Sequence, residues 1–136
     1  MCGIVGYLGE RDCTEVLMSG LEKLEYRGYD SVGIAVSEDG VIKTVKTKGK
    51  LVDMKQKLKT VGAPLGHCGI GHTRWATHGE PSDVNSHPHS NGRVTIVHNG
   101  IIENYIQLKE FLMTKGYKFV SQTDSEVVAC LLDYHY

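Results

Sequence analysis

The sequence predicts an α+β fold, and three observations carry that prediction. Short apolar runs typical of strands alternate with segments in which apolar residues recur at helical spacing. A turn signal, Asp39–Gly40, joins two strand-like segments directly, which favours antiparallel hairpins over a doubly wound parallel sheet. The 136 residues are 40% hydrophobic and 23% charged, which suits one folded core and excludes a disordered chain.

The first strand and helix are predicted at the start of the chain. Residues 3–8 form a short apolar, partly β-branched run, which is typical of a buried strand. Asp12 is placed to cap a helix, and this helix is expected to end near Gly28. The predicted apolar face of the helix contains Val16, Leu17, Gly20, Leu21 and Leu24.

A hairpin and a second helix follow. Residues 31–37 and 41–47 are strand-like segments on either side of the Asp39–Gly40 turn. The next segment is predicted to be a helix that closes at Gly62. Its apolar residues at helical spacing are Leu51, Met54, Leu58 and Val61.

Three further strands are predicted in the second half. They are expected at residues 67–75, 93–100 and 117–121, because each segment combines apolar and β-branched or aromatic residues. A polar loop separates the first two of these segments.

Two helices complete the prediction. One is expected from about Asn104 to Lys115, with Gly116 after its end. Its inward side chains are predicted to be Tyr105, Ile106, Leu108, Leu112 and Met113. The last helix should begin near Asp124 or Ser125. It reaches Tyr136 with an aromatic, apolar end, so we expect the chain to be cut short of its full domain.

Composition argues against several classes of partner. Fifteen basic and 16 acidic residues give a net charge of −1, which supplies no general attraction to nucleic acid or to an anionic membrane. The apolar runs are too short to span a bilayer, and the first residues lack the pattern of a secretory signal. Four cysteines at irregular spacing, without a C-x-x-C pair, indicate reduced thiols and a cytoplasmic protein.

Cys2 is the first candidate for chemistry, because it stands directly after the initiating methionine. Removal of Met1 would give Cys2 a free α-amine with a pKa of about 7.7–8.0, next to a thiol of about 8.5. One residue could then supply both base and nucleophile. The alternative is that a cysteine stands there without any catalytic role.

Two further motifs could serve such a nucleophile. The Asn99 amide and the Gly100 backbone N–H could stabilise an oxyanion, although an Asn-Gly pair is also a common hairpin turn. Arg27 could lend positive charge near the N-terminal strand, or it could be a solvated arginine at a helix end.

A free amino acid would need one group for its carboxylate and another for its ammonium. Arg74 has the planar guanidinium suited to a carboxylate. Asp124 could bind the ammonium, or it could cap the final helix. Trp75, the single tryptophan, is expected to pack or to act as a lid at the loop edge.

Six cysteine and histidine side chains crowd one stretch and raise a zinc site as an alternative. They are His67, Cys68, His72, His78, His87 and His89. Their spacing matches no common zinc motif, and we expect His87 and His89 to point to opposite sides of the chain. We therefore expect no metal, and we expect the loop histidines to fix the loop by hydrogen bonds.

Five sequence blocks in order resemble the class II glutamine amidotransferase family. The blocks are MCGIVGY, EYRGYDSVGIA, GIGHTRWATHGEPSDVNSHPH, VHNGIIENY and QTDSEVV. The resemblance covers essentially the whole chain. It implies an N-terminal-nucleophile hydrolase fold, an αββα sandwich, incomplete here because the family's domain continues beyond Tyr136. Residues 1–136 would then be a partial glutamine amidotransferase domain, in which Cys2 becomes the first residue once Met1 is removed.

The resemblance also implies residue roles. Cys2 matches the nucleophile, Asn99 and Gly100 the oxyanion site, and Arg27 an arginine that orders the N-terminal site. Substrate contacts are implied for Arg74, Trp75, Thr77, His78 and Asp124, with Trp75 resembling a residue that gates ammonia. His87 matches a position that packs at the interdomain side.

The implied reaction releases ammonia from L-glutamine through a γ-glutamyl thioester on Cys2, with no metal or organic cofactor. The blocks are most similar to the branch that passes ammonia to fructose 6-phosphate in sugar-isomerase domains, as a homodimer, and forms glucosamine 6-phosphate. The chain alone is expected to bind glutamine poorly, with little or no activity. The alternatives are a family member with another acceptor and a glutamine-binding module without turnover.

Overall fold

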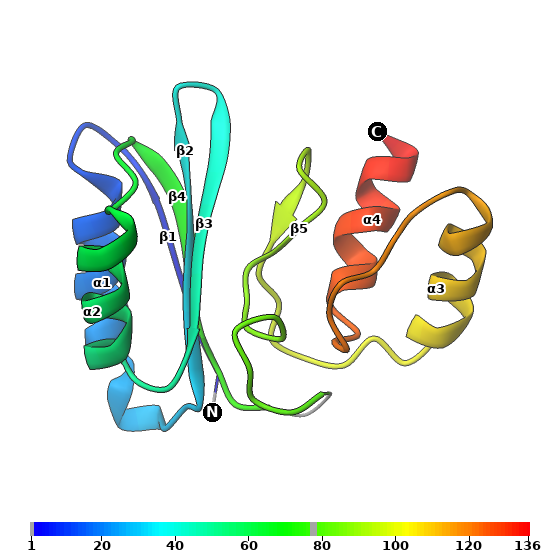
Figure 1. Ribbon diagram of the computed structural model, residues 1–136, viewed down its shortest axis with the longest axis horizontal. Helices are drawn as coiled ribbons and strands as arrows, with labels where there is room; N and C mark the ends of the chain where they lie inside the picture. Colours follow the sequence, from blue (N-terminus) through cyan, green and yellow to red (C-terminus); the bar gives the residue numbers. More distant parts are fainter. Residues whose placement is uncertain (1, 77–78) are drawn as a thin grey trace.

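A computed structural model of the protein describes residues 2–76 and 79–136. The described residues form a four-stranded sheet, a two-stranded sheet and two pairs of α-helices. Figure 1 shows the layers in the order helices, large sheet, small sheet, helices. This arrangement confirms the α+β class, and its layers follow the helix–sheet–sheet–helix order that the family resemblance implies. None of the helices in the described ranges has the length and apolar character that a bilayer crossing requires.

The large sheet is antiparallel throughout and has the strand order β1-β4-β2-β3. Its strands are β1 (Gly3–Leu8), β2 (Ser31–Glu38), β3 (Val41–Lys48) and β4 (Cys68–Arg74). All four were predicted from sequence, as was the Asp39–Gly40 turn, whose residues both have positive φ, 52° and 81°. In the register, Gly3 pairs with Thr73 and Ser31 with Arg74. The start of β1 therefore lies beside the end of β4.

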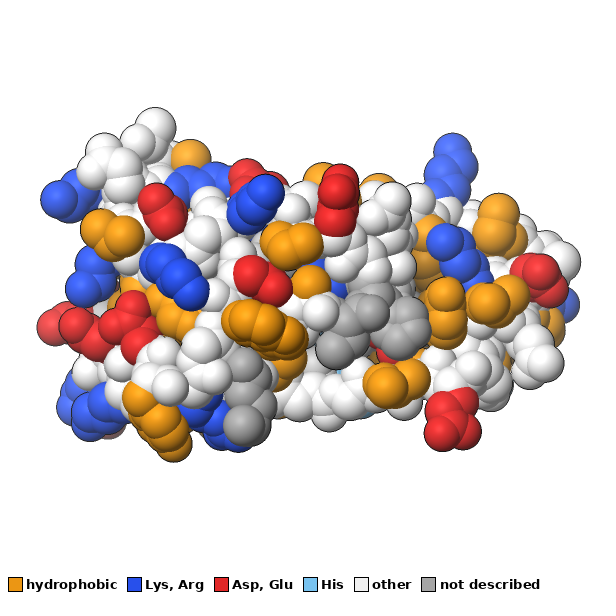
Figure 2. Space-filling view, turned by 90° about the horizontal axis from the view of Figure 1, so that it is seen from below, with side chains coloured by type: hydrophobic (Ala, Val, Ile, Leu, Met, Phe, Trp, Pro, Cys, Tyr) orange, Lys and Arg blue, Asp and Glu red, His pale blue; other side chains and the backbone are white. Residues whose placement is uncertain are grey.

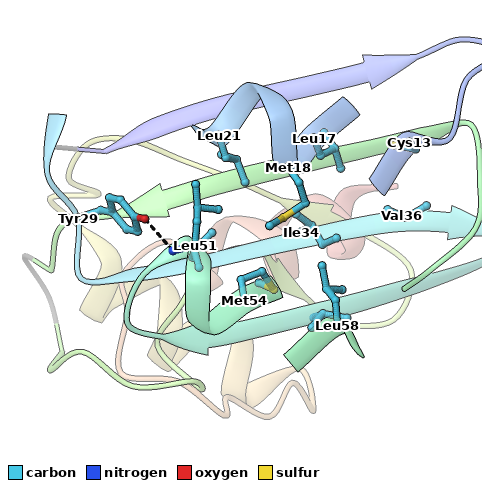
Figure 3. Close-up of a cluster of buried hydrophobic side chains, with 12 residues drawn as sticks. Cys13, Leu17, Met18, Leu21, Tyr29, Ile34, Val36, Leu51, Met54 and Leu58 are labelled. Atoms are coloured by element: carbon cyan, nitrogen blue, oxygen red, sulfur yellow. Dashed lines mark hydrogen bonds between the residues drawn. The ribbon is translucent and has the colours of Figure 1, made fainter. Parts of the chain in front are cut away.

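Two helices cover one face of this sheet: α1 (Cys13–Lys23) and α2 (Leu51–Val61). The Asp12 side chain accepts a hydrogen bond from the Thr14 N–H at 3.1 Å, which confirms the predicted cap. Figure 3 shows Leu17 and Leu21 of α1 packed with Met54 of α2 against the sheet. Burying each such side chain stabilises the fold by about 1.5–3 kcal/mol. Val61 is an exception to the predicted apolar face, because it is exposed at the helix end.

One polar contact ties this core to the turn after α1. The chain there forms η1 (Glu25–Arg27), and Tyr29 follows it. The Tyr29 hydroxyl accepts from the Leu51 N–H at 2.8 Å, drawn as a dashed line in Figure 3, and donates to Glu25 Oε1 at 2.7 Å. Burial, together with the Glu25 carboxylate, raises the pKa of Tyr29 to about 12.

The other two layers are smaller. The second sheet pairs β5 (His89–Ser90) with β6 (Thr95–Ile96), and α3 (Tyr105–Thr114) packs on α4 (Glu126–His135) beyond it. Leu112, Val127 and Cys130 form the buried centre of this second core.

Two predicted strands are wrong in whole or in part. Only Thr95–Ile96 of residues 93–100 is paired, and no strand forms at residues 117–121. A strand needs a neighbour to satisfy its backbone, and at residues 117–121 a side chain takes that role. The Glu126 carboxylate accepts from the Val120 N–H at 2.9 Å and the Ser121 N–H at 2.8 Å.

The inward face of α3 is narrower than predicted. Leu112 is fully buried, and Tyr105 and Leu108 pack partly against the second core. Ile106 and Met113 are each 57% exposed. Ile106 and Met113 are seven positions apart, so they lie on one side of the helix. This side is next to the one that packs on α4, and it is exposed.

Charges of both signs are mixed on the molecular surface. Among the described residues on the face drawn in Figure 2, Lys and Arg side chains are interspersed with Asp and Glu, without an extended patch of one sign. Some of these charges are paired, as Lys57 Nζ and Asp83 Oδ2 are at 3.0 Å. Such exposed pairs add little to stability.

Candidate active site

A pocket of about 270 Å³ lies where the ends of both sheets meet the segment before α4. This volume is near the lower end for small-molecule sites, so it suits one small ligand. The lining residues come from distant parts of the sequence: Cys2, Arg74, Trp75, His87, His98, Gly100, Ile101, Thr123, Asp124 and Ser125. The structure thus brings together five predicted site residues, namely Cys2, Arg74, Trp75, Gly100 and Asp124.

The Cys2 sulfur is held at the edge of the pocket by the chain that leaves β4. Pairing of Gly3 with Thr73 places Cys2 beside Trp75. The Trp75 N–H donates to Cys2 Sγ at 3.2 Å, and the thiol is 3.7 Å from the Trp75 carbonyl oxygen. The sulfur is half-buried and not in a disulfide. A thiol fixed at a pocket wall and open to it has the placement that a nucleophile requires.

Arg74 provides a buried positive charge next to this sulfur. The side chain is 4% exposed, and its Nη2 donates to the Gly79 carbonyl oxygen at 3.3 Å. Burial lowers the pKa of Arg74, while the charges of Asp30, Cys2 and Asp124 act in the opposite direction. An arginine remains protonated in any such setting, so the pocket contains a permanent guanidinium.

Asp124 provides the opposite charge. It is 3% exposed, and its Oδ2 accepts from the Ile102 N–H at 2.6 Å. The residue at the N-cap position of α4 is Ser125. Asp124 therefore lies in the pocket wall, and its role in binding an ammonium stays a prediction. Together with Arg74, it matches the two charges of a free amino acid.

The Asn99–Gly100 pair is not a hairpin turn, because no strand follows it before α3. Gly100 has φ 147° and lines the pocket. Asn99 lies on the exposed side of this segment, and its Oδ1 is 2.7 Å from Nε2 of His72. Gly100 therefore contributes backbone to the pocket wall, whereas its neighbour Asn99 is not among the described residues that line the pocket.

The remaining predicted site residues lie elsewhere or outside the described residues. Arg27 is in the η1 turn and is not one of the described residues that line the pocket. The next residue, Gly28, faces Trp75, since a Cβ on it would be 4.0 Å from the Trp75 ring. Thr77 and His78 lie outside the described residues. The roles of these residues stay predictions.

Three histidines form a buried row beside the pocket, and the middle one, His87, lines it. The rings of His72 and His87 stack with centroids 4.1 Å apart, and His89 meets His87 edge-on at 4.5 Å. Burial lowers the pKa of His72 to about 4 and that of His89 to about 3, and it lowers that of His87 further. All three imidazoles are therefore neutral at pH 7.

This row corrects one argument made from sequence. His87 and His89 do not point to opposite sides, since their rings are 4.5 Å apart. The argument was wrong because residues two positions apart in an extended chain share one face. The prediction that loop histidines form hydrogen bonds is confirmed for His89, whose Nε2 lies 2.8 Å from Thr123 Oγ1. Within residues 2–76 and 79–136, no group of three or more His, Cys, Asp or Glu side chains has a metal-binding arrangement.

Sequence reasoning missed several lining residues. His98 and Ser125 flank predicted positions and are joined by a hydrogen bond of 3.1 Å between Nδ1 and Oγ. Their proximity to Asn99 and Asp124 in the sequence was the one available signal. Nothing local marks His72 as a neighbour of Asn99, because 27 positions separate them.

Comparison with known proteins gives consistent results. A family model described as "Glutamine amidotransferase domain" matches residues 43–134. The glutamine–fructose-6-phosphate aminotransferase [isomerizing] of Clostridium tetani is 61% identical over the whole chain, and that of Thermus thermophilus is 55% identical. The chain spans 22–23% of the length of these relatives.

Two solved structures share the fold. One is a glutamine phosphoribosylpyrophosphate amidotransferase from B. subtilis, with a TM-score of 0.77 and 27% identity over 98% of this chain and 29% of its own. The other, described as the allosteric regulatory enzyme of purine biosynthesis, has a TM-score of 0.80 and 28% identity at the same coverage.

Proposed function

This chain belongs to the glutamine amidotransferase domain family, and from that premise we propose that Cys2 is the nucleophile that releases ammonia from L-glutamine. Residues 1–136 would form part of the glutaminase domain of a larger enzyme. The observation that carries the proposal is the meeting of Cys2, Arg74 and Asp124 in one pocket. The proposed chemistry uses only groups of this chain, in keeping with a family resemblance that implies no cofactor.

The proposed first step forms a covalent intermediate. After removal of Met1, the α-amine of Cys2 accepts the thiol proton, and the sulfur attacks the side-chain amide carbon of glutamine. The negative charge that develops on the amide oxygen is stabilised by the Asn99 side-chain N–H and the Gly100 backbone N–H. Collapse of this intermediate breaks the C–N bond. The leaving nitrogen takes the proton from the α-ammonium, so that ammonia departs and a γ-glutamyl thioester remains.

The second step returns the free enzyme. Water attacks the thioester, and the α-amine accepts a proton from that water. The C–S bond then breaks, glutamate leaves, and the α-ammonium returns its proton to the sulfur, which regenerates the thiol. The same oxyanion donors act on the second tetrahedral intermediate.

Recognition of the amino-acid end of glutamine is assigned to charges on the pocket wall. The Arg74 guanidinium would bind the α-carboxylate, and the Asp124 carboxylate the α-ammonium. Thr77, His78 and Trp75 would complete the substrate loop, and Arg27 would order the N-terminal segment. A buried, fixed pair of opposite charges selects a zwitterion over uncharged amides of similar size.

We propose that the whole enzyme passes this ammonia to fructose 6-phosphate and forms glucosamine 6-phosphate, as a homodimer in the cytoplasm. The support is the higher identity to relatives named for that acceptor, 55–61%, than to the structure named for a phosphoribosylpyrophosphate acceptor, 27%. Incubation of the full-length enzyme with glutamine and either acceptor tests this choice. We expect an amino sugar phosphate only from fructose 6-phosphate, and phosphoribosylamine as the product would overturn it.

The nucleophile is tested by Cys2→Ala and Cys2→Ser in the full-length protein. We expect glutaminase turnover to fall on the order of 1,000-fold or more. Cys68→Ala is the matched control, because Cys68 is a free, exposed cysteine outside the pocket. Mass spectrometry after rapid quenching should detect a γ-glutamyl adduct on residue 2 in the unsubstituted enzyme only. Undiminished ammonia release from Cys2→Ala would refute the proposal.

A further inference from the structure

His72 is the one buried ring in contact with the Asn99 side chain among the residues that the structure describes. It lies on β4 with no exposed surface, and its Nε2 is 2.7 Å from Asn99 Oδ1 and 3.2 Å from the His98 carbonyl oxygen. A carbonyl oxygen only accepts hydrogen bonds, so the contact with His98 places the imidazole proton on Nε2. The Asn99 atom that meets this N–H must then be the amide oxygen.

The surroundings of the ring keep it in this state. The His87 ring stacks on one side at 4.1 Å, and burial together with the nearby Arg74 charge disfavours a second proton. At neutral pH, His72 therefore has one proton, held on Nε2, and one orientation. A neutral donor of this kind fixes its partner without adding a charge to the site.

The consequence concerns the two ends of the Asn99 amide. With Oδ1 held by His72, the amide NH₂ group is directed away from β4. Rotation by half a turn would bring that NH₂ against the Nε2–H, so that two donors face each other and a hydrogen bond is lost. Asn99 is not among the described lining residues, but the next residue, Gly100, is. The fixed orientation therefore decides which end of the Asn99 amide can reach a ligand beside Gly100.

We propose that His72 is a positioning residue for the oxyanion site, which sets the orientation of the Asn99 amide through the Nε2–H to Oδ1 hydrogen bond. This inference rests on the proposed function, in which the Asn99 N–H stabilises the oxyanion. His72 does not touch the substrate. It acts through Asn99.

The test compares four single variants and one double variant of the full-length enzyme, with glutamine hydrolysis as the assay. His72→Leu removes the donor at similar size, and we expect kcat to fall about 10- to 100-fold with KM changed less than about 2-fold. His72→Gln can place an N–H donor near the former Nε2 and should recover most of kcat. His72→Asn reaches only the position of Nδ1 and should not. In Asn99→Ala, a further His72→Leu change should have no additional effect.

A second readout separates positioning from damage to the fold. Alkylation of Cys2 by iodoacetamide forms no oxyanion, so its rate should stay within about 2-fold in every variant. Three results would each overturn the inference. The first is an equal loss of alkylation rate and hydrolysis rate in a His72 variant. The others are fully additive losses of kcat for His72→Leu and Asn99→Ala, and equal kcat in His72→Gln and His72→Asn. Asn99→Ala that retains full kcat would overturn the oxyanion assignment itself and this inference with it. A low kcat in Asn99→Ala beside normal His72 variants would overturn this inference alone.

Discussion

The carbonyl oxygen of His87 lies directly against the Cα of Gly33. A Cβ added to Gly33 would be 1.8 Å from that oxygen and 2.9 Å from the carbonyl carbon. Gly33 is on β2 of the large sheet, and His87 lines the pocket just before β5. The absence of a side chain at Gly33 therefore sets how closely the segment that contains His87 approaches the large sheet.

We expect Gly33→Ala to destabilise the fold by about 3 kcal/mol or more, because the backbone of His87 would have to move. Gly6→Ala is the matched control, since Gly6 is also on the large sheet and a Cβ there meets no atom within 4 Å. The control should change stability by less than about 0.5 kcal/mol. The loss of stability in each variant is measured by hydrogen exchange of peptides from β2 and residues 87–96 in the full-length protein. Equal protection in the two variants would contradict the close approach.

Stability should decline as the pH falls below about 6.5. Burial lowers the pKa of His72 to about 4 and that of His89 to about 3, so the unfolded chain binds protons that the folded chain does not bind. Stability is therefore fully present above about pH 6.5 and is lost through pH 4, by roughly 1 kcal/mol per pH unit for each histidine. Urea unfolding at pH 7.5, 6 and 5 gives the slope of the free energy of unfolding against pH. His89→Gln keeps a donor for Thr123 and should make the slope shallower. An unchanged slope in that variant would refute the assignment.

Asp124→Asn should weaken glutamine binding with little change in the free energy of unfolding. Asparagine keeps an oxygen for the Ile102 N–H but removes the negative charge proposed to bind the α-ammonium. We expect KM for glutamine to rise about 10- to 100-fold. Glutaramate, which lacks the amino group, should inhibit the variant and the unsubstituted enzyme equally. Glu103→Gln changes an exposed carboxylate next to Ile102 in the chain, outside the described pocket lining, and serves as the control. A KM that is unchanged in Asp124→Asn would remove this residue from the substrate site.

Glu126→Ala should loosen the segment before α4. The Glu126 side chain is 4% exposed and accepts from two backbone N–H groups and from the Ser121 hydroxyl, the last at 2.5 Å. Its removal leaves buried donors without an acceptor, so we expect a loss of about 2–4 kcal/mol. Glu126→Gln should lose less. Glu110→Ala, on the exposed face of α3, should stay within about 0.5 kcal/mol. Exchange rates of residues 119–123 report the effect, and unchanged rates in Glu126→Ala would contradict it.

The sequence by itself determined the elements whose signal is local. Asp12 caps α1, and Asp39–Gly40 forms a tight turn because both residues accept positive φ. The spacing of Leu51, Met54 and Leu58 forms one helical stripe. These features depend on residues within a few positions of one another, so propensity and periodicity decide them. The order of the five motif blocks likewise points to the glutamine amidotransferase family, because it is a property of the sequence alone.

Tertiary structure decided the features that depend on partners distant in the sequence. Residues 117–121 have the composition of a strand, yet Glu126 accepts from the Val120 and Ser121 N–H groups and no strand forms. Likewise, only the tertiary structure places Asp124 beside the Ile102 N–H and in the pocket wall. The contact of His72 with Asn99 has no local signature. The physical reason is that a backbone or side-chain polar group takes whichever partner the packing of the layers brings within reach, and the sequence near that group does not specify this partner.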